Sequence, residues 1–408
     1  MKPQMNEDKH GLKSDFMERL LDGMAVEWKP LGEVAELKRG KTITAKTKTA
    51  GDIPVISGGQ SPAYYNAEFN RDGETITVAG SGAYAGFVMY WNEPIFVSDA
   101  FSVKPDLAVL STRYVFHSLL NNQAWIHNLQ KGSGVPHVYP KDLAQLQIPI
   151  PCPDDPVKSL KIQTEIVRIL DTFTELTAEL TAELTAELTA RKKQYTYYRD
   201  QLLTFEEGEV EWKPLGEIAK ILRGASPRPI AKFVTDDENG VPWIKIGDTS
   251  PASKYVTKTA QKITPEGAKN SRVLKKGDFI MSNSMSFGRP YILKIDGAIH
   301  DGWASISDFE DKLNSDYLYH YLSSNNVQNY WISKINSGSV SNLNADIIKT
   351  LPVPIPPLEE QERIVSILDK FDALTTSITE GLPREIELRQ MQYEYYRNML
   401  LTFPKGKE

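Results

Sequence analysis

A four-residue alternation of apolar and polar positions marks the middle of the chain. Between Thr174 and Arg191 the sequence reads TELTAELTAELTAELTAR, with three exact Thr-Ala-Glu-Leu copies after an imperfect one. Alanine and glutamate favour helix, and leucines four residues apart stay near one helix face. The pattern predicts part of a long helix that packs against a partner helix, although an ordinary amphipathic helix would explain the leucines alone. Each exact copy would lengthen the helix by about 6 Å, which is typical of a segment whose length matters.

The same order of patterns occurs twice along the chain. Val26–Gly40 (VEWKPLGEVAELKRG) recurs as Val210–Gly224 (VEWKPLGEIAKILRG). Gln163–Phe173 (QTEIVRILDTF) recurs as Gln361–Phe371 (QERIVSILDKF). A repeated frame of this kind indicates that one structural unit has been duplicated.

The segments between the repeated frames resemble each other only loosely. Short apolar runs such as Glu74–Val78 and Asp278–Ser282 predict strands separated by glycine- and serine-rich turns. Each segment closes with one predicted helix, Tyr114–Gln130 or Tyr317–Ile335, and a proline-spaced exit, IPIPCP or VPIPPL. Proline there would end a strand and begin a helix.

The duplication predicts an α+β fold in which two β-rich modules are separated by two long antiparallel, coiled-coil-like helices with pseudo-twofold symmetry. We place the first module at residues 26–153, the second module at 210–356, and the helical spacers at 154–209 and 357–408. Residues 1–25 would complete the C-terminal region. Gly381 and Pro383 stand in place of TAEL copies and should break or kink the second spacer.

Chain length, apolar runs and cysteine content limit the possible number of domains and the possible location of the protein in the cell. A length of 408 residues predicts two or more domains, and no apolar run is long enough to cross a membrane or to form a signal peptide. Cys152 is the only cysteine, so an internal disulfide and a cysteine-rich zinc site are excluded. We therefore expect a cytoplasmic protein without membrane association.

The net charge of −6 is unevenly spread along the chain. Residues 26–150 are balanced and 210–350 carry a net charge of +3, whereas the two helical regions carry −5 and −3. DNA binding depends on local basic patches, so composition neither supports nor excludes it.

Motifs of an independent enzyme are missing from the sequence. There is no phosphate loop, H-E-x-x-H or G-x-S-x-G motif, and His117 and His320 are most simply packing residues on equivalent helices. Gly80, Gly82 and Gly86 superficially resemble a dinucleotide-binding loop. A strand-like run rather than a helix follows them, which favours a tight turn between strands.

Basic and polar side chains gather in loops of both modules. Lysine and arginine would neutralise phosphates, while glutamine, asparagine, serine and arginine can bond base edges. For any single residue a solvated surface is the simpler explanation, and only the clustering in two similar modules favours DNA. The candidates are Lys38, Arg39, Lys41, Lys46, Ser57, Gly59, Gln60, Ser81 and Tyr84 in the first module, and Arg223, Arg228, Lys232, Lys275, Lys276, Ser282, Asn283 and Arg289 in the second.

Together these features resemble the specificity subunits of type I restriction-modification enzymes, and most closely their IC subfamily. The resemblance covers nearly the whole chain. Its motifs are the duplicated PLGE entry (Pro30–Glu33, Pro214–Glu217), the proline-to-EQ exit (Pro354–Gln361, weaker at Pro149–Gln163) and the tandem TAEL. The resemblance implies two target-recognition domains, each reading half of a split double-stranded DNA site.

The resemblance also implies partners for the helices. Two modification subunits would dock there, bind S-adenosylmethionine and methylate adenines, and restriction subunits would use ATP and Mg. No cofactor or metal is expected on this chain. The candidate spacer and docking positions are Leu176, Leu180, Leu184, Leu188, Tyr195, Tyr198, Ile364, Leu368 and Tyr396.

The family further suggests that the number of TAEL copies sets the spacer between half-sites. One copy adds about 6 Å of helix, and one base pair adds about 3.4 Å of DNA. If the helix is tilted relative to the DNA, one added copy could therefore correspond to one added base pair in the spacer. Two other functions stay open: a coiled-coil scaffold with two protein-binding modules, and a self-sufficient methyltransferase. The missing Asn/Asp-Pro-Pro-Tyr/Phe tetrapeptide argues against the methyltransferase.

Overall fold

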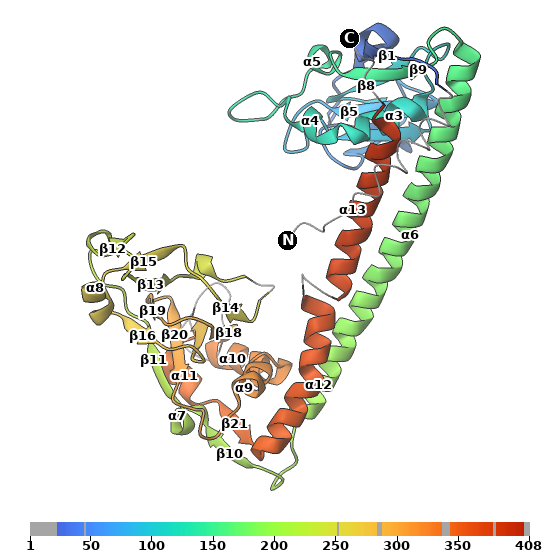
Figure 1. Cartoon of the computed structure of the whole chain (residues 1–408). Coiled ribbons are helices and arrows are strands. Elements are labelled where there is room, and N and C mark those ends of the chain that lie inside the picture. Colours follow the sequence, from blue (N-terminus) through green and yellow to red (C-terminus); the bar gives the residue numbers. More distant parts are fainter. Residues whose placement is uncertain are drawn as a thin grey trace. The chain divides into compact units, whose positions relative to one another are not determined.

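The chain folds into two compact units (Figure 1). The computed structural model describes residues 23–44, 46–250, 253–283, 288–336, 343–377 and 381–403. Unit 1 comprises residues 1–180 and 388–408, and unit 2 comprises residues 181–387. Each unit therefore combines one β-rich module with parts of the helical regions. The predicted α+β class, with two modules and long helices, is confirmed.

The first module of unit 1 is built on a four-stranded antiparallel sheet of order β2-β8-β5-β6. A three-stranded sheet, β4-β3-β7, and a two-stranded sheet, β1-β9, complete it. The elements are β1 (Val26–Pro30), α2 (Leu31–Val34), β2 (Ala35–Arg39), β3 (Ile53–Ile56), β4 (Tyr64–Asn66), β5 (Glu74–Ala79), β6 (Val88–Asn92), β7 (Phe96–Val97), β8 (Ala100–Pro105), α3 (Thr112–Asn121), α4 (Gln123–His127), α5 (Pro140–Leu143) and β9 (Gln147–Pro151).

The second module of unit 2 repeats this sheet in the order β11-β20-β17-β18, with β14 added at the edge. A second five-stranded sheet, β12-β15-β13-β19-β16, and the pair β10-β21 accompany it. The elements are β10 (Glu211–Pro214), α7 (Leu215–Ile218), β11 (Lys220–Arg223), η1 (Ile230–Lys232), β12 (Val234–Thr235), β13 (Val241–Ile244), η2 (Ile246–Asp248), β14 (Tyr255–Val256), β15 (Gln261–Ile263), α8 (Pro265–Lys269), β16 (Arg272–Leu274), β17 (Phe279–Ser282), β18 (Pro290–Leu293), β19 (Gly297–Ile299), β20 (Trp303–Ser307), α9 (Ser315–Leu322), α10 (Asn325–Asn336), α11 (Ala345–Lys349) and β21 (Pro352–Ile355).

The repeated entry and exit motifs pair with each other. β1 runs antiparallel to β9, with Trp28 opposite Pro149, and β10 runs antiparallel to β21, with Trp212 opposite Pro354. Proline is tolerated in these two-stranded ribbons because each strand needs a partner on one side only. The pairing closes each module where its chain enters and leaves.

The PLGE motif begins a short helix, α2 or α7, that buries its first and last residues. Leu31 and Leu215 are fully buried, and their amides donate to Leu146 O and Leu351 O, each at 2.8 Å. A β-carbon at Gly32 would lie 2.9 Å from the Ala144 β-carbon, which explains the glycine. Backbone geometry therefore accounts for the duplicated motif.

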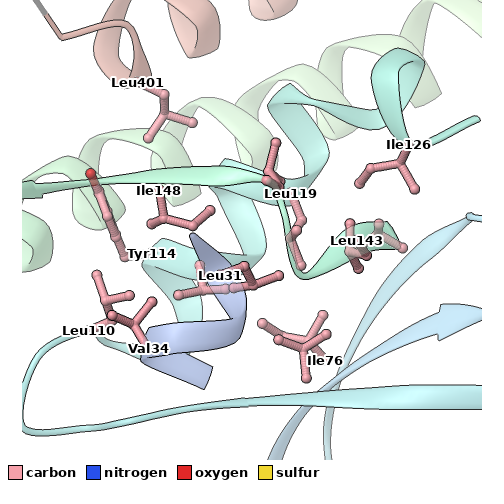
Figure 2. Packing of buried hydrophobic residues seen from close by; sticks show 14 of the residues in the cluster. Leu31, Val34, Ile76, Leu110, Tyr114, Leu119, Ile126, Leu143, Ile148 and Leu401 are labelled. Atoms are coloured by element: carbon pink, nitrogen blue, oxygen red, sulfur yellow. The ribbon is translucent and has the colours of Figure 1, made fainter. Parts of the chain in front are cut away.

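One hydrophobic core joins the first module to the helices. Figure 2 shows Leu31 of α2, Ile76 of β5, Tyr114 and Leu119 of α3, and Leu401 near the chain end packed in one cluster. Five successive residues of β5 are buried, because both faces of this strand are covered. The C-terminal residues thus belong to the core of unit 1.

The predicted single helices Tyr114–Gln130 and Tyr317–Ile335 are wrong in one respect, since each is two helices. In unit 1, α3 ends at Asn121, and the side-chain amide of the C-cap residue Asn122 donates to Ser118 O at 2.8 Å. In unit 2, the Ser324 hydroxyl accepts from Val327 N as the next helix begins. Polar residues that bond nearby main chain favour helix ends over helix interiors.

The predicted long helix is confirmed as α6 (Pro156–Leu202), a continuous helix of 47 residues. The other helical region forms α12 (Leu358–Thr376) and α13 (Leu382–Leu401). In unit 1, α13 lies beside the first part of α6: the Phe173 and Tyr396 rings stack at 5.3 Å (Figure 1). In unit 2, Phe371 of α12 stacks on Tyr195 and Tyr198 of α6.

The expected break at Gly381 and Pro383 is confirmed. α12 ends at Thr376, and α13 begins at Leu382 with proline in its first turn. Gly381 has φ +84°, a left-handed conformation that favours glycine. Residues 1–25 are predicted to complete the C-terminal region. Most of this segment, residues 1–22, lies outside the described part of the chain.

A buried glutamine fastens each module to its helix. Gln163 Nε2 donates to Val109 O at 2.8 Å, and its Oε1 accepts from Ser111 N at 2.9 Å. Gln361 makes the same pair with Lys312 O and Asn314 N, at 2.9 and 2.8 Å. Ser111 and Asn314 are the N-cap residues of α3 and α9. The repeated glutamine is therefore a structural anchor.

A buried histidine and a helix carboxylate form a second equivalent contact. His117 Nε2 lies 2.7 Å from Asp171 Oδ1, and His320 Nε2 lies 2.9 Å from Asp369 Oδ1. Burial lowers the pKa of His117. Burial alone would raise the pKa of Asp171, but hydrogen bonds from Arg113 and His117 lower it. Both histidines are packing residues, as predicted, and they also fix the helix.

We predict that Gln361→Leu destabilises unit 2. The similar volume preserves packing, but Asn314 N–H and Lys312 C=O lose their buried partner, which costs about 1–3 kcal/mol per group. Tm should fall by at least about 5 °C in a thermal scan of the full chain. Gln201→Leu, at an exposed position of α6 in the same unit, is the matched control and should leave Tm unchanged. A Gln361→Leu chain as stable as wild type would contradict the anchor.

Candidate nucleic-acid interface

In the first module, three loops meet on the short segment from β7 to β8, and a fourth loop packs on one of them. Gly40 N donates to Ala100 O at 2.9 Å, and Gly80 N donates to Asp99 O at 3.1 Å. Ser98 N donates to Ile56 O at 2.8 Å, which brings the loop after β3 to the same place. Gly82 N reaches Pro136 O at 3.0 Å. We call this set the Asp99 loop cluster: residues 40–44, 57–60, 80–84 and 131–138 around 97–100.

Close main-chain contacts in the Asp99 loop cluster require glycine. A β-carbon at Gly40 would lie 2.2 Å from Ser98 O, and one at Gly58 would lie 2.3 Å from Ser81 O. Gly82 has φ +87°. Gly80, Gly82 and Gly86 form the predicted tight turn between strands, and β6 (Val88–Asn92) follows where a dinucleotide site would need a helix. The cluster is thus a preformed surface of ordered loops.

In the second module, an equivalent arrangement surrounds Asp301. Gly224 N donates to Trp303 O at 2.8 Å, and a β-carbon at Gly224 would lie 2.1 Å from His300 O. The Asp301 carbonyl accepts from Arg223 Nε at 3.3 Å and from Asn283 Nδ2 at 3.1 Å. We call residues 223–228, 283 and 300–303 the Asp301 loop cluster.

The Asp301 carboxylate holds two further side chains of this cluster. It accepts from the Ser226 hydroxyl at 2.9 Å and lies 3.5 Å from an Arg228 guanidinium nitrogen. The Ser226 hydrogen bond lowers the pKa of Asp301 below its usual value, so the carboxylate is ionised at neutral pH. Arg228 itself is 83% exposed, so its guanidinium is available to an external anion.

The structure brings together most of the candidates that the sequence singled out in the first module. Lys38 and Arg39 end β2 beside the cluster, and Lys41 N donates to Val97 O at 2.9 Å. Tyr84 is 46% exposed on the turn after Ser81. Ser57, Gly59, Gln60 and Ser81 lie within the cluster, whereas Lys46 lies in an exposed turn next to Lys48, which packs over Tyr64.

The second-module candidates are more dispersed. Arg223, Arg228 and Asn283 belong to the Asp301 loop cluster, but Ser282 is buried in β17. Lys275 and Lys276 precede β17 and therefore lie at its opposite end from Asn283. Lys232 lies in η1, and the Arg289 guanidinium lies over the Tyr291 ring at 5.6 Å.

Sequence reasoning missed the loop at residues 136–138. An isolated bridge pairs Ser81 with His137, and Val138 N donates to Gly80 O at 3.1 Å. The preceding Gly132-Ser133-Gly134 stretch is typical of a loop, but only the fold places residues 136–138 beside Ser81. Its counterpart around Ser337 lies outside the described residues.

The candidate spacer positions fall into three environments. Tyr195, Ile364 and Leu368 are buried in the core of unit 2, so they hold this chain's own module. Leu180, Leu184 and Leu188 are half-buried, and Leu176 is 47% exposed. Tyr198 stacks on Phe371, and Tyr396 stacks on Phe173.

Two other kinds of site are absent from the described ranges. There, no three His, Cys, Asp or Glu side chains are grouped as a metal ion would require. Within those ranges, too, no helix has the length and apolar character needed to cross a membrane. Two duplicated modules, each presenting an ordered cluster of basic, amide and hydroxyl groups, define a two-module recognition protein.

Comparison with known proteins gives the family. A family model for the type I restriction modification DNA specificity domain matches twice, at residues 25–190 and 207–388. The specificity subunit of the type I restriction enzyme EcoR124I/EcoR124II from Escherichia coli is 37% identical, covering 96% of this chain and 97% of the relative. The EcoprrI specificity subunit from the same species is 32% identical, with coverages of 90% and 92%.

A solved structure has the same fold. A chain from a study of complex assembly in the type I R-M system superposes with a TM-score of 0.65 at 17% identity, covering 92% of this chain and 97% of that one. The chain belongs to the type I restriction-modification DNA specificity family. It is a non-catalytic specificity subunit with two target-recognition domains, which confirms the family that the sequence resembles, while the assignment to the IC subfamily stays a prediction.

We predict that Gly224→Ala distorts the Asp301 loop cluster. The new β-carbon would clash with His300 O, so the 300–303 segment must shift at a cost of about 1–3 kcal/mol. Hydrogen–deuterium exchange at residues 299–303 should become faster. Gly247→Ala is the matched control in the same module, because nothing lies within 4 Å of its β-carbon position. Equal exchange in both variants would show that the close approach is unimportant.

Proposed function

We propose that this chain reads a bipartite double-stranded DNA target, with the Asp99 loop cluster on one half-site and the Asp301 loop cluster on the other. The observation that carries the proposal is the equivalence of the two clusters. Each forms beside the same strand of the repeated sheet, β8 or β20, and each presents basic and hydrogen-bonding side chains. Such groups can neutralise phosphates and bond base edges.

The proposal extends to the partners of the helices. Two modification subunits would dock on them, bind S-adenosylmethionine and methylate adenine, and restriction subunits would supply ATP- and Mg-dependent cleavage in the cytoplasm. Exposed apolar side chains support docking: Val157 of α6 is 66% exposed and Leu358 of α12 is 52% exposed. The relatives' names as specificity subunits of restriction enzymes agree with this assignment.

The TAEL copies are proposed to set the spacing of the half-sites, as in the IC type. Module 1 fastens to α6 at Gln163 and Asp171, before the copies. Module 2 fastens to α6 at Tyr195 and Asp200, after the copies. Because α6 is continuous from Pro156 to Leu202, each added copy lengthens the helix between the two fastening regions by about 6 Å.

We predict that cells expressing this chain with its modification subunit methylate adenine in a split motif with a fixed gap. Genome-wide mapping of methylated adenine gives both half-sites at once. A continuous motif would mean that one module alone reads DNA. The absence of any motif from an intact complex, together with DNA affinity that does not fall with salt, would favour the protein-binding scaffold.

We predict that deleting residues 185–188 shortens the gap and leaves both half-sites unchanged. The deletion removes one copy, about 6 Å of helix and about 400° of helical rotation, so the helix faces keep nearly the same orientation. The same mapping experiment measures the gap.

A length-preserving variant separates length from chemistry. The double substitution Thr185→Ala and Glu187→Gln changes the exposed side chains of the same copy but keeps the helix length. Its gap should equal that of wild type. An unchanged gap after the deletion, or altered half-site bases, would refute the proposal that the number of TAEL copies sets the spacing.

A further inference from the structure

One acidic residue lies at the centre of each loop cluster. Asp99 stands one residue before β8, and Asp301 stands two residues before β20. Both main-chain carbonyls hold neighbouring loops: Asp99 O accepts from Gly80 N, and Asp301 O accepts from Arg223 and Asn283. The modules differ in most interior residues, yet both have an aspartate just before the equivalent strand, β8 or β20.

A serine hydroxyl donates a hydrogen bond to each carboxylate, and each carboxylate can still accept further hydrogen bonds. Asp99 accepts a hydrogen bond from Ser81 while its side chain stays exposed. Asp301 accepts from Ser226 on Oδ1, and its side chain is 39% exposed beside Arg228. A carboxylate offers about four lone-pair sites, so one or two neighbours do not saturate it.

The charge of these groups restricts what they can meet on DNA. A fixed carboxylate repels phosphates, so it suits a DNA-facing surface only where it meets a hydrogen-bond donor. In the major groove guanine and thymine present acceptors, and adenine presents an acceptor beside its amino group. Cytosine presents its amino donor alone, and carboxylates are the side chains that accept from it.

We infer that Asp99 and Asp301 are specificity-determining residues, each accepting a hydrogen bond from the exocyclic amino group of a cytosine in its own half-site. The inference rests on the proposed function, since it names one base contact within each proposed half-site. Ser81 and Ser226 act as positioning residues that orient the carboxylates.

Asparagine substitutions test the inference with little change of shape. Asp99→Asn and Asp301→Asn keep an oxygen that accepts from Ser81 or Ser226, but they replace the second oxygen by a donor. Mapping of methylated adenine should show that each variant loses its cytosine preference by about 10-fold at one position of one half-site. The preference should move toward adenine, which asparagine bonds on two atoms.

Matched controls lie at the far ends of the same strands. Asp106 directly follows β8, and Asp308 directly follows β20 with φ +58°, a conformation that asparagine tolerates. Asp106→Asn and Asp308→Asn make the same chemical change away from the clusters and should keep the wild-type motif.

A change on the DNA gives a second readout that needs no methylation by the variants. The proposed cytosine is replaced by 2-pyrimidinone, which lacks the exocyclic amino group, in a duplex carrying the mapped site. The wild-type complex should bind this duplex about 10-fold more weakly, whereas the Asp99→Asn or Asp301→Asn complex should bind both duplexes alike. Equal binding by wild type, or equal losses by wild type and variant, overturns the inference.

The outcomes separate the inference from the function on which it rests. A wild-type complex that yields no split motif would contradict the proposed function. A split motif that survives both asparagine substitutions, or a half-site made only of A·T pairs, would overturn the aspartate contacts and leave two-module reading intact.

Discussion

A single buried amide side chain joins each recognition module to the long helices. Gln163 and Gln361 each satisfy one main-chain donor and one acceptor at the start of a module helix, where the N-cap residue leaves its amide without a helical partner. A shift along or around the helix would leave these groups buried and unbonded, at about 1–3 kcal/mol each. Hydrophobic packing is less directional than these hydrogen bonds, so the glutamine and the histidine–carboxylate contact together fix the docking position.

The frame of the fold could be predicted from sequence because its signals are local or repeated. The TAEL period predicts α6, apolar runs predict strands such as β5, and Gly381 with Pro383 predicts the helix break. The pairing of β1 with β9 and the gathering of loops around Asp99 and Asp301 depend on contacts between residues far apart in sequence. No local pattern reports these contacts, so individual base-reading residues stay predictions.

The histidine and the helix carboxylate are the constant parts of the second contact, whereas the cation beside the carboxylate differs between the two units. In unit 1, Asp171 pairs with His117 and with Arg113 of α3. In unit 2 the residue equivalent to Arg113 is acidic, Asp316, and Lys254 from a different loop lies 2.9 Å from Asp316 and 3.0 Å from Asp369. Burial alone would lower the pKa of Lys254, but the two carboxylates raise it. A cation near the helix carboxylate is retained while the element that supplies it changes.

Within each module, different groups determine stability and specificity. The loop clusters are held by main-chain hydrogen bonds and by glycines that permit close approach, as at Gly40 and Gly224. Side chains that point outward from such a cluster contribute little to its stability, because surface substitutions away from buried contacts usually cost less than about 0.5 kcal/mol. A module can therefore change the groups it offers to DNA while its anchors on the helix stay fixed. This explains why the frames of the two halves are nearly identical and their interiors are not.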